Sequence, residues 1–376
     1  MTTVHGTVKP GFERVRDEFA AVADGSAQLA AYHRGEQVVD LWTGQDIDGD
    51  SLLGAYSASK GAAHLTVALL VQDGVLDLDQ RVSHYWPEFA AEGKQDVTLR
   101  DLLAHRGGLV GSDEGFSRAD LADDRVVAER LARQRPFWRP GSAFGYHALV
   151  VGALSGEVVR RATGRTLQEH FADRVRDPYA VDFYLGLPAE LEPRFVSTQP
   201  MVLTPERQLP LPAANSLPGI AFNRHHPQGP EVWELPNFPE VRRLGAASFG
   251  GVASARGLAR MYAAAISPLD GEPPLLKPEI AAEFGQIQSV GYDVVLREHK
   301  AFGVGFHVTS ERYPELGQGS LGHSGAGGQQ AFADPRNGIA YGYTRRRIPF
   351  PAAAAPENEP LIKALYSALR AVESPR

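Results

Sequence analysis

Strand-like segments lie near both ends of this 376-residue chain, and helical patterns occupy most of the sequence between them. Residues 27–43 contain two apolar runs separated by a short polar turn, which is typical of a β-hairpin. Near the other end, the strand-like residues 329–333 and 339–344 enclose Asn337-Gly338, a strong hairpin signal. Residues 302–308 alternate in the manner of a further strand. The two ends of the chain are therefore expected to share one sheet.

The most apolar helical pattern extends from Ser57 to about Asp73 and ends at Gly74. Its apolar residues lie on more than one face, as in helices buried at the centre of a fold. Further helical patterns, several with capping residues at their start, occur at residues 12–22, 98–103, 148–162, 166–169, 255–265 and 360–369.

Together these segments predict an α/β (α+β) fold in which helices flank an antiparallel sheet. Residues 1–75 and 245–376 are expected to form the sheet domain. Residues 76–244 are expected to form a mostly helical domain inserted between them, and its last part, from residue 186, is rich in proline and loop-like. We expect the active site at the junction of the two domains.

Composition excludes several classes of function. The chain has no cysteine, which excludes disulfides, thiolate nucleophiles and cysteine-ligated zinc. Its formal net charge of −7, without a basic block, argues against nucleic-acid binding. The most apolar run, residues 65–71, is too short to span a bilayer, and the N-terminus lacks the pattern of a signal peptide. We therefore expect a cytoplasmic protein that binds neither nucleic acid nor membrane.

The start of the apolar helix carries a candidate nucleophile. In Ser57-Ala58-Ser59-Lys60 the spacing puts the Ser57 hydroxyl and the Lys60 amine on one face, one turn apart. A lysine desolvated at such a position can become neutral and act as a base toward the hydroxyl. By itself the motif is weak, because a capping serine followed by a solvated lysine is the more common meaning of this spacing.

Other blocks strengthen the motif by their order along the chain. They are Asp101–His105 with Gly107-Gly108-Leu109, Phe137–Gly141, Tyr146-His147-Ala148, Gly250–Arg256 and Leu321–Gly328. With these blocks the sequence resembles the serine β-lactamase-like superfamily, which has the penicillin-binding-protein (transpeptidase) fold. It looks closest to the class C β-lactamase-related enzymes known as family VIII esterases. The resemblance covers most of the chain.

The resemblance implies a catalytic role for three residues. Ser57 matches the nucleophile that forms an acyl-enzyme, and Lys60 matches its partner base. Tyr146 matches the tyrosine of the family's Tyr-x-Asn element, which exchanges protons with the nucleophile and the leaving group. We expect neither a metal nor an organic cofactor.

The resemblance also implies the surroundings of the nucleophile. His323, Ser324 and Gly325 match the Lys-Thr-Gly element, which lies on an edge strand beside the site and contacts substrate. The backbone N–H groups of Ser57 and Ala326 match the oxyanion hole, whose donors stabilise the charge of the tetrahedral intermediate.

Two departures from the β-lactamase pattern concern the substrate. Ala148 stands where the asparagine of Tyr-x-Asn would grip a substrate amide, and His323 stands where a lysine would supply a permanent positive charge. A neutral imidazole attracts a substrate carboxylate weakly at pH 7. Both changes favour neutral esters over penicillins.

The function expected from these residues is hydrolysis of a small carboxylic ester through an acyl-Ser57 intermediate. One alternative is an acyltransferase of the same fold, which would pass the acyl group to an amine or alcohol. Others are a β-lactamase or D-amino-acid peptidase, and a catalytically silent binding protein. The sequence leaves open the natural substrate, the acyl acceptor and the oligomeric state.

Overall fold

The computed structural model of the chain describes residues 3–208 and 211–373. Within these residues, nine strands form one antiparallel sheet in the order β1-β3-β2-β12-β11-β10-β9-β8-β7. Its strands are β1 (Val4–Val8), β2 (Ala27–His33), β3 (Glu36–Thr43), β7 (Ser289–Tyr292), β8 (His299–Phe302), β9 (His307–Val308), β10 (Leu321–Ser324), β11 (Gln330–Asp334) and β12 (Ile339–Arg345). A small second sheet has the order β4-β6-β5 and consists of β4 (Leu53–Gly54), β5 (Phe183–Tyr184) and β6 (Val252–Ala253).

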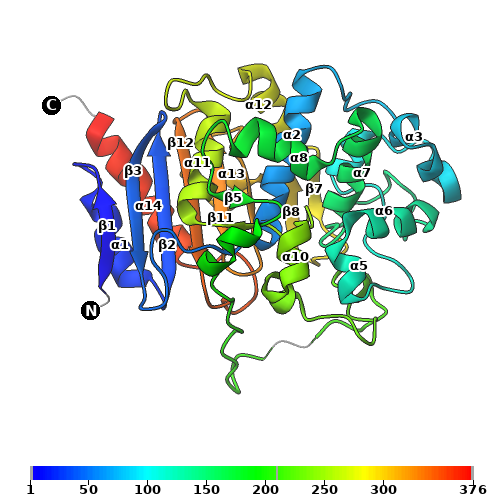
Figure 1. Cartoon of the computed structure of the whole chain (residues 1–376), viewed down its shortest axis with the longest axis horizontal. Coiled ribbons are helices and arrows are strands. Elements are labelled where there is room, and N and C mark those ends of the chain that lie inside the picture. Colours follow the sequence, from blue (N-terminus) through cyan, green and yellow to red (C-terminus); the bar gives the residue numbers. More distant parts are fainter. Residues whose placement is uncertain (1–2, 209–210, 374–376) are drawn as a thin grey trace.

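The two ends of the chain meet at the centre of the large sheet (Figure 1). Strand β2 pairs with β12 along its whole length, from Ala27 opposite Arg345 to His33 opposite Ile339. This pairing confirms the predicted fold class, a sheet built from both ends and flanked by helices.

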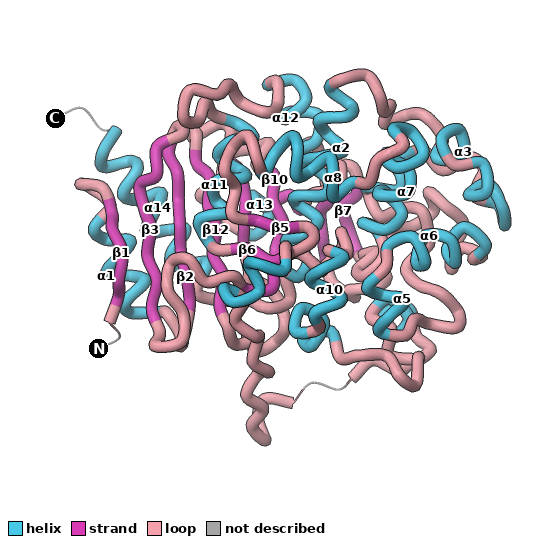
Figure 2. Tube along the Cα trace, viewed as in Figure 1, coloured by secondary structure: helices cyan, strands magenta, loops and turns pink. Residues whose placement is uncertain are grey.

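Helices occupy both faces of the sheet and the region beyond it (Figure 2). The α-helices are α1 (Glu13–Val22), α2 (Ser59–Gln72), α3 (Val82–Tyr85), α4 (Leu99–Leu103), α5 (Arg118–Ala122), α6 (Asp124–Arg133), α7 (Val151–Thr163), α8 (Leu167–Phe171), α9 (Leu217–Ala221), α10 (Pro239–Leu244), α11 (Ala255–Ile266), α12 (Pro278–Gly285), α13 (Thr309–Arg312) and α14 (Asn358–Glu373). None of the helices in the described residues is long and apolar enough to cross a lipid bilayer.

The alternation of side chains along β2 divides the core into two layers. Leu29 and Ala31 belong to a cluster that contains the apolar faces of α1 and α14. Ala30 and Tyr32 point the other way, into a larger cluster that contains α2 and α11. Gly342 of β12 allows α11 to approach closely, because a Cβ at this position would lie 2.6 Å from the Ala255 carbonyl oxygen.

Helix α2 runs through the larger cluster, and all its residues from Ser59 to Leu70 are buried. This agrees with its apolar pattern. It begins two residues later than predicted, because Ser57 lies in a preceding 3-10 helix (Tyr56–Ala58). Tyr56 has a left-handed φ of +47°, which is uncommon for a residue other than glycine, and the chain turns there into α2.

Two strand predictions in the last quarter of the chain were wrong. Residues 302–308 do not form one strand: β8 ends at Phe302 and β9 begins at His307. The Gly303 amide donates to the Phe306 carbonyl at 2.8 Å, and Gly305 has a φ of +78°, so the chain reverses within the alternating pattern. Because β7, β8 and β9 extend the sheet, β10 lies between β11 and β9 and is not an edge strand.

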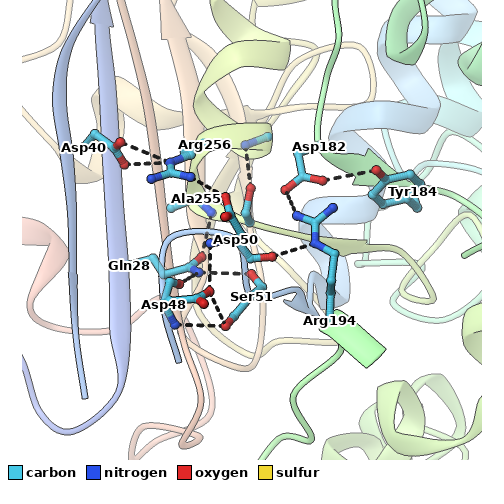
Figure 3. A network of polar contacts seen from close by, with 12 residues as sticks. Gln28, Asp40, Asp48, Asp50, Ser51, Asp182, Tyr184, Arg194, Ala255 and Arg256 are labelled. Carbon is cyan, nitrogen blue, oxygen red and sulfur yellow. Dashed lines mark hydrogen bonds and ion pairs between the residues drawn. The ribbon is translucent and has the colours of Figure 1, made fainter. Parts of the chain in front are cut away.

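A polar network holds the start of α11 against the sheet and the loops beside it (Figure 3). The Arg256 guanidinium contacts the carboxylate of Asp40 on β3 at 2.9 Å and that of Asp50 at 2.5 Å. The Gln28 side chain accepts from the Ala255 amide at 2.9 Å and donates to the Ser51 carbonyl at 3.0 Å. The network fixes the segment that follows Gly251. The Gly251 amide itself donates to the Ser59 side chain of α2.

The division of the chain into a sheet domain and an inserted helical domain stays a prediction.

Candidate active site

Ser57 and Lys60 lie in contact at the N-terminal end of α2. The Lys60 Nζ atom is 3.0 Å from the Ser57 Oγ atom. It also donates to the carbonyl oxygens of Ala148, at 2.6 Å, and Ser248, at 2.8 Å. Lys60 is fully buried, whereas Ser57 is partly exposed.

Burial decides the charge that Lys60 carries. Desolvation holds the pKa of the Lys60 amine well below its ordinary value of 10.5. A neutral amine has two N–H donors and one lone pair. The two carbonyl oxygens occupy the donors, which leaves the lone pair for the Ser57 hydroxyl. Three oxygen contacts suit an ammonium group equally well, so the lowered pKa, and not the contacts, favours the neutral base.

Tyr146 lies beside this pair, in the irregular segment before α7. Its ring centroid is 4.9 Å from the Lys60 Nζ atom, and the ring stacks on Phe302 at 5.9 Å. Burial raises the pKa of the phenol above its ordinary value of 10.0, while a hydrogen bond with the Ser57 side chain acts in the opposite direction. Tyr146 is therefore a neutral proton donor over the physiological range.

The turn after β10 lies against the residue that precedes Ser57. A Cβ at Gly325 would lie 2.7 Å from the Ala55 carbonyl oxygen, and one at Gly327 would lie 2.6 Å from the Tyr56 ring. Only residues without a side chain permit this approach. The turn, which contains the partly exposed Ala326, therefore packs on Ala55 and Tyr56, the two residues before the partly exposed Ser57.

His323 and Ser324 occupy the end of β10 next to this turn. His323 is fully buried, and its Nδ1 atom is 2.7 Å from the Ser324 carbonyl oxygen. Because that nitrogen faces a carbonyl, it carries the proton. Burial holds the pKa of His323 well below 6.5, so the imidazole is neutral at pH 7. Ser324 is partly exposed and faces His307, with 3.5 Å between Oγ and Nδ1.

The structure brings Lys60 and Tyr146 to Ser57 and places His323 beside Tyr146, with 6.0 Å between their ring centroids. It also adds residues that sequence reasoning missed. The ring of His307 on β9 packs against that of His323 in a tilted arrangement, with 3.9 Å between ring centroids, and Ser248 supplies a carbonyl to Lys60. Neither stands out in the sequence, since one lies in an alternating run and the other is a lone serine. Among the described residues, no group of three or more His, Asp or Glu side chains is arranged to hold a metal ion.

Comparison with known proteins assigns this arrangement to a family. The family model described as Beta-lactamase matches residues 15–360. The chain belongs to the β-lactamase family. The family predicted from the motifs is therefore confirmed.

Individual members of the β-lactamase family resemble the chain over nearly its whole length. Esterase/beta-lactamase LipL of Mycobacterium tuberculosis is 31% identical over 369 residues, which cover 92% of this chain and 83% of that protein. The structure of EstA from Arthrobacter nitroguajacolicus Rue61a is 39% identical, with full coverage of both chains and a TM-score of 0.91. A family VIII carboxylesterase is 32% identical over 97% of this chain and 100% of that one, with a TM-score of 0.86.

Proposed function

We propose that the protein is a serine hydrolase that cleaves small carboxylic esters through an acyl-Ser57 intermediate. The observation that carries the proposal is the buried Lys60 amine, which lies 3.0 Å from the Ser57 hydroxyl with two carbonyl oxygens on its donors. Activation of a serine by a desolvated lysine is one established form of nucleophilic catalysis. The esterase names of the relatives support the same function.

The first half of the reaction transfers the acyl group to the enzyme. The neutral Lys60 amine takes the Ser57 proton while Oγ attacks the ester carbonyl carbon. The backbone N–H groups of Ser57 and Ala326 stabilise the negative oxygen of the tetrahedral intermediate. As the C–O bond breaks, the phenol of Tyr146 gives its proton to the leaving alkoxide and regains one from Lys60. The products are an alcohol, the acyl-enzyme and a neutral lysine.

The second half repeats these steps with water. Water gives a proton to the same groups and attacks the acyl carbon, and the Ser57 oxygen leaves with a proton, so the free enzyme is restored. An amine or alcohol that replaced water would turn the same chemistry into acyl transfer.

The proposed substrate is a neutral ester. His323 is buried and uncharged, and the Ala148 side chain offers no hydrogen bond to a substrate amide, although its carbonyl oxygen contacts Lys60. The site therefore lacks two groups with which a β-lactamase grips its substrate. His323, Ser324 and Gly325 would then contact the ester mainly through backbone atoms and the Ser324 hydroxyl.

A pair of serine variants tests the nucleophile. Ser57→Ala is expected to lower the turnover of a p-nitrophenyl ester by several orders of magnitude. Ser59→Ala is the matched control, because the buried Ser59 Oγ accepts from the Gly251 amide at 3.0 Å and takes no part in the proposed reaction. Its loss should lower the free energy of unfolding by about 1–3 kcal/mol and leave the rate of ester cleavage unchanged. Near-normal turnover by Ser57→Ala would overturn the proposal.

A comparison of substrates tests the ester preference. The kcat/KM value for a neutral ester is expected to exceed that for nitrocefin with the same preparation. A higher value for nitrocefin would instead make the protein a β-lactamase. If both values are low and an added alcohol or amine speeds release of the acyl group, the enzyme is an acyltransferase.

A further inference from the structure

The backbone around Tyr146 is held by side chains from distant parts of the chain. Tyr146 lies in an irregular segment between α6 and α7, where no regular element supports the main chain. Three consecutive amides nevertheless have partners. The Gly145 amide donates to the His105 carbonyl at 3.1 Å, and the His147 amide donates to the His105 Nδ1 atom at 3.2 Å. Between them, the Tyr146 amide donates to the carboxylate of Asp293.

Asp293 is fully buried just after β7, and its two oxygens share its contacts unequally. Oδ1 accepts from the amides of Val295 and Leu296, each at 2.8 Å, which closes the turn after β7. Oδ2 is 3.0 Å from the Tyr146 nitrogen, and Oδ1 is 3.2 Å from it. One carboxylate therefore joins two segments that are far apart in sequence.

Further contacts pack the segment of Tyr146 directly against the turn after β7. The Val294 amide donates to the Phe144 carbonyl at 3.2 Å. A Cβ at Gly145 would lie 2.8 Å from a methyl group of Val295 and 2.9 Å from one of Val294. The segment of Tyr146 thus rests directly on the turn that Asp293 closes.

We propose that Asp293 is a positioning residue, which fixes the phenol of Tyr146 where it can give a proton to the departing alcohol. The inference rests on the proposed function, since it requires Tyr146 to protonate the leaving group. Asp293 acts through Tyr146 and has no contact with substrate. A displacement of a reacting group by about 1 Å commonly costs about 100-fold in rate.

Asp293→Asn tests this because it removes the closer of the two oxygens that face the Tyr146 amide and can leave the turn intact. If the amide oxygen takes the place of Oδ1, the turn through Val295 and Leu296 stays intact. An NH₂ group then replaces Oδ2 and opposes the Tyr146 amide, donor against donor. Asp334→Asn is the matched control. Asp334 is equally buried, at the other end of β11 from the Gly325–Gly328 turn, and accepts from the Gly317 amide at 2.9 Å and the Tyr366 hydroxyl at 2.6 Å.

The measurement is kcat/KM for the ethyl and the p-nitrophenyl ester of one acid. Ethoxide needs a proton to leave, whereas p-nitrophenolate does not. Asp293→Asn is expected to lower the ethyl value about 100-fold and the p-nitrophenyl value far less. Tyr146→Phe should show the same selectivity, the double variant should lose little more, and Asp334→Asn should leave the ratio unchanged.

The outcomes separate the inference from the function. If Tyr146→Phe changes the ratio and Asp293→Asn does not, the positioning role is wrong while the proposed function stands. If neither changes the ratio, Tyr146 does not protonate the leaving group and the inference is also wrong. If Asp293→Asn does not fold, the same ratio is measured for Asp293→Glu, which keeps the charge but moves the oxygens. Loss of folding in both variants would overturn the inference by making Asp293 a folding residue.

Discussion

Two proton-bearing groups beside Ser57, the Lys60 amine and the Tyr146 phenol, respond to burial in opposite directions. Desolvation disfavours the charged form of each, so it lowers the pKa of the lysine and raises that of the tyrosine. Both groups are therefore neutral over a wide range of pH. A neutral amine is a base and a neutral phenol is an acid, which are the forms that the proposed reaction uses.

We predict from these shifts that esterase activity rises with pH and then reaches a broad plateau. The activity is lost at low pH, where Lys60 is protonated, and the plateau begins well below the ordinary lysine value of 10.5. It extends into the alkaline range because Tyr146 keeps its proton beyond 10.0. The measurement is kcat/KM for a neutral ester against pH. Activity that falls as the pH rises through neutrality would contradict the assignment.

Lys60 and Tyr146 are also predicted to act as one proton-handling unit. Lys60→Ala and Tyr146→Phe should each lower the acylation rate for an alkyl ester by about 100-fold or more. The double variant should lose little beyond either single one, because both groups serve the same step. Single-turnover kinetics measure the acylation rate. Losses that multiply would show that the two residues act independently.

At the scale of elements, the glycine turn after β10 holds Ala326, the proposed oxyanion donor. A methyl group at Gly325 would meet the Ala55 carbonyl oxygen at 2.7 Å, and backbone cannot yield as a flexible side chain can. We predict that Gly325→Ala moves Ala326 away from Ser57 and lowers kcat about 100-fold or more, which is the usual cost of one oxyanion donor.

Gly156→Ala is the control for the added methyl group. Gly156 lies within α7, and its nearest neighbour to a new Cβ would be Leu167 at 3.9 Å. This variant should keep full activity and gain about 0.5–1 kcal/mol of stability, because alanine favours the helix. Equal activity of Gly325→Ala and Gly156→Ala would show that the position of the turn does not affect the reaction.

Local signals predicted the elements that local interactions create. The hairpin of β2 and β3 and the capping boxes follow from residues a few positions apart; at Thr166, for example, the hydroxyl accepts from the Glu169 amide as expected. The break between β8 and β9 was missed because glycines interrupt a strand pattern without changing its alternation.

The candidate site was predictable only in part for the same reason. Ser57 and Lys60 share one helical turn, and Tyr146 was found through the order of the family motifs. Asp293 and His307 carry no comparable signal, since they reach Tyr146 and Ser324 through contacts between segments far apart in the chain. Sequence reasoning could predict which central residues lie together but not the groups that support them.

At the scale of the whole molecule, the buried histidines link stability to pH. Burial lowers the pKa of His64 and His147 to about 4, and it lowers the pKa of His105 and His323 well below 6.5. In the unfolded chain these side chains bind protons below about 6.5. Between these values the unfolded state therefore binds more protons than the folded state, and the free energy of unfolding decreases as the pH falls.

We predict a steep loss of stability from pH 6.5 toward pH 4. Each histidine that is protonated in the unfolded chain but stays neutral in the folded state would remove about 1.4 kcal/mol per pH unit. Urea unfolding at a series of pH values measures the effect. His64→Gln should reduce the slope of the unfolding free energy against pH by the contribution of about one proton. An unfolding free energy that is constant between pH 6.5 and 5 would contradict the prediction.

The pairing of β2 with β12 also determines when the sheet can be completed during translation. Strand β2 ends at His33, and its partner begins only at Ile339. At about 5–20 residues per second, the ribosome needs on the order of tens of seconds to make the intervening chain. During that time the N-terminal hairpin has emerged with one strand edge unpaired and its apolar faces uncovered. Newly made chains of this protein should therefore depend on chaperones until the ribosome has released the last strand.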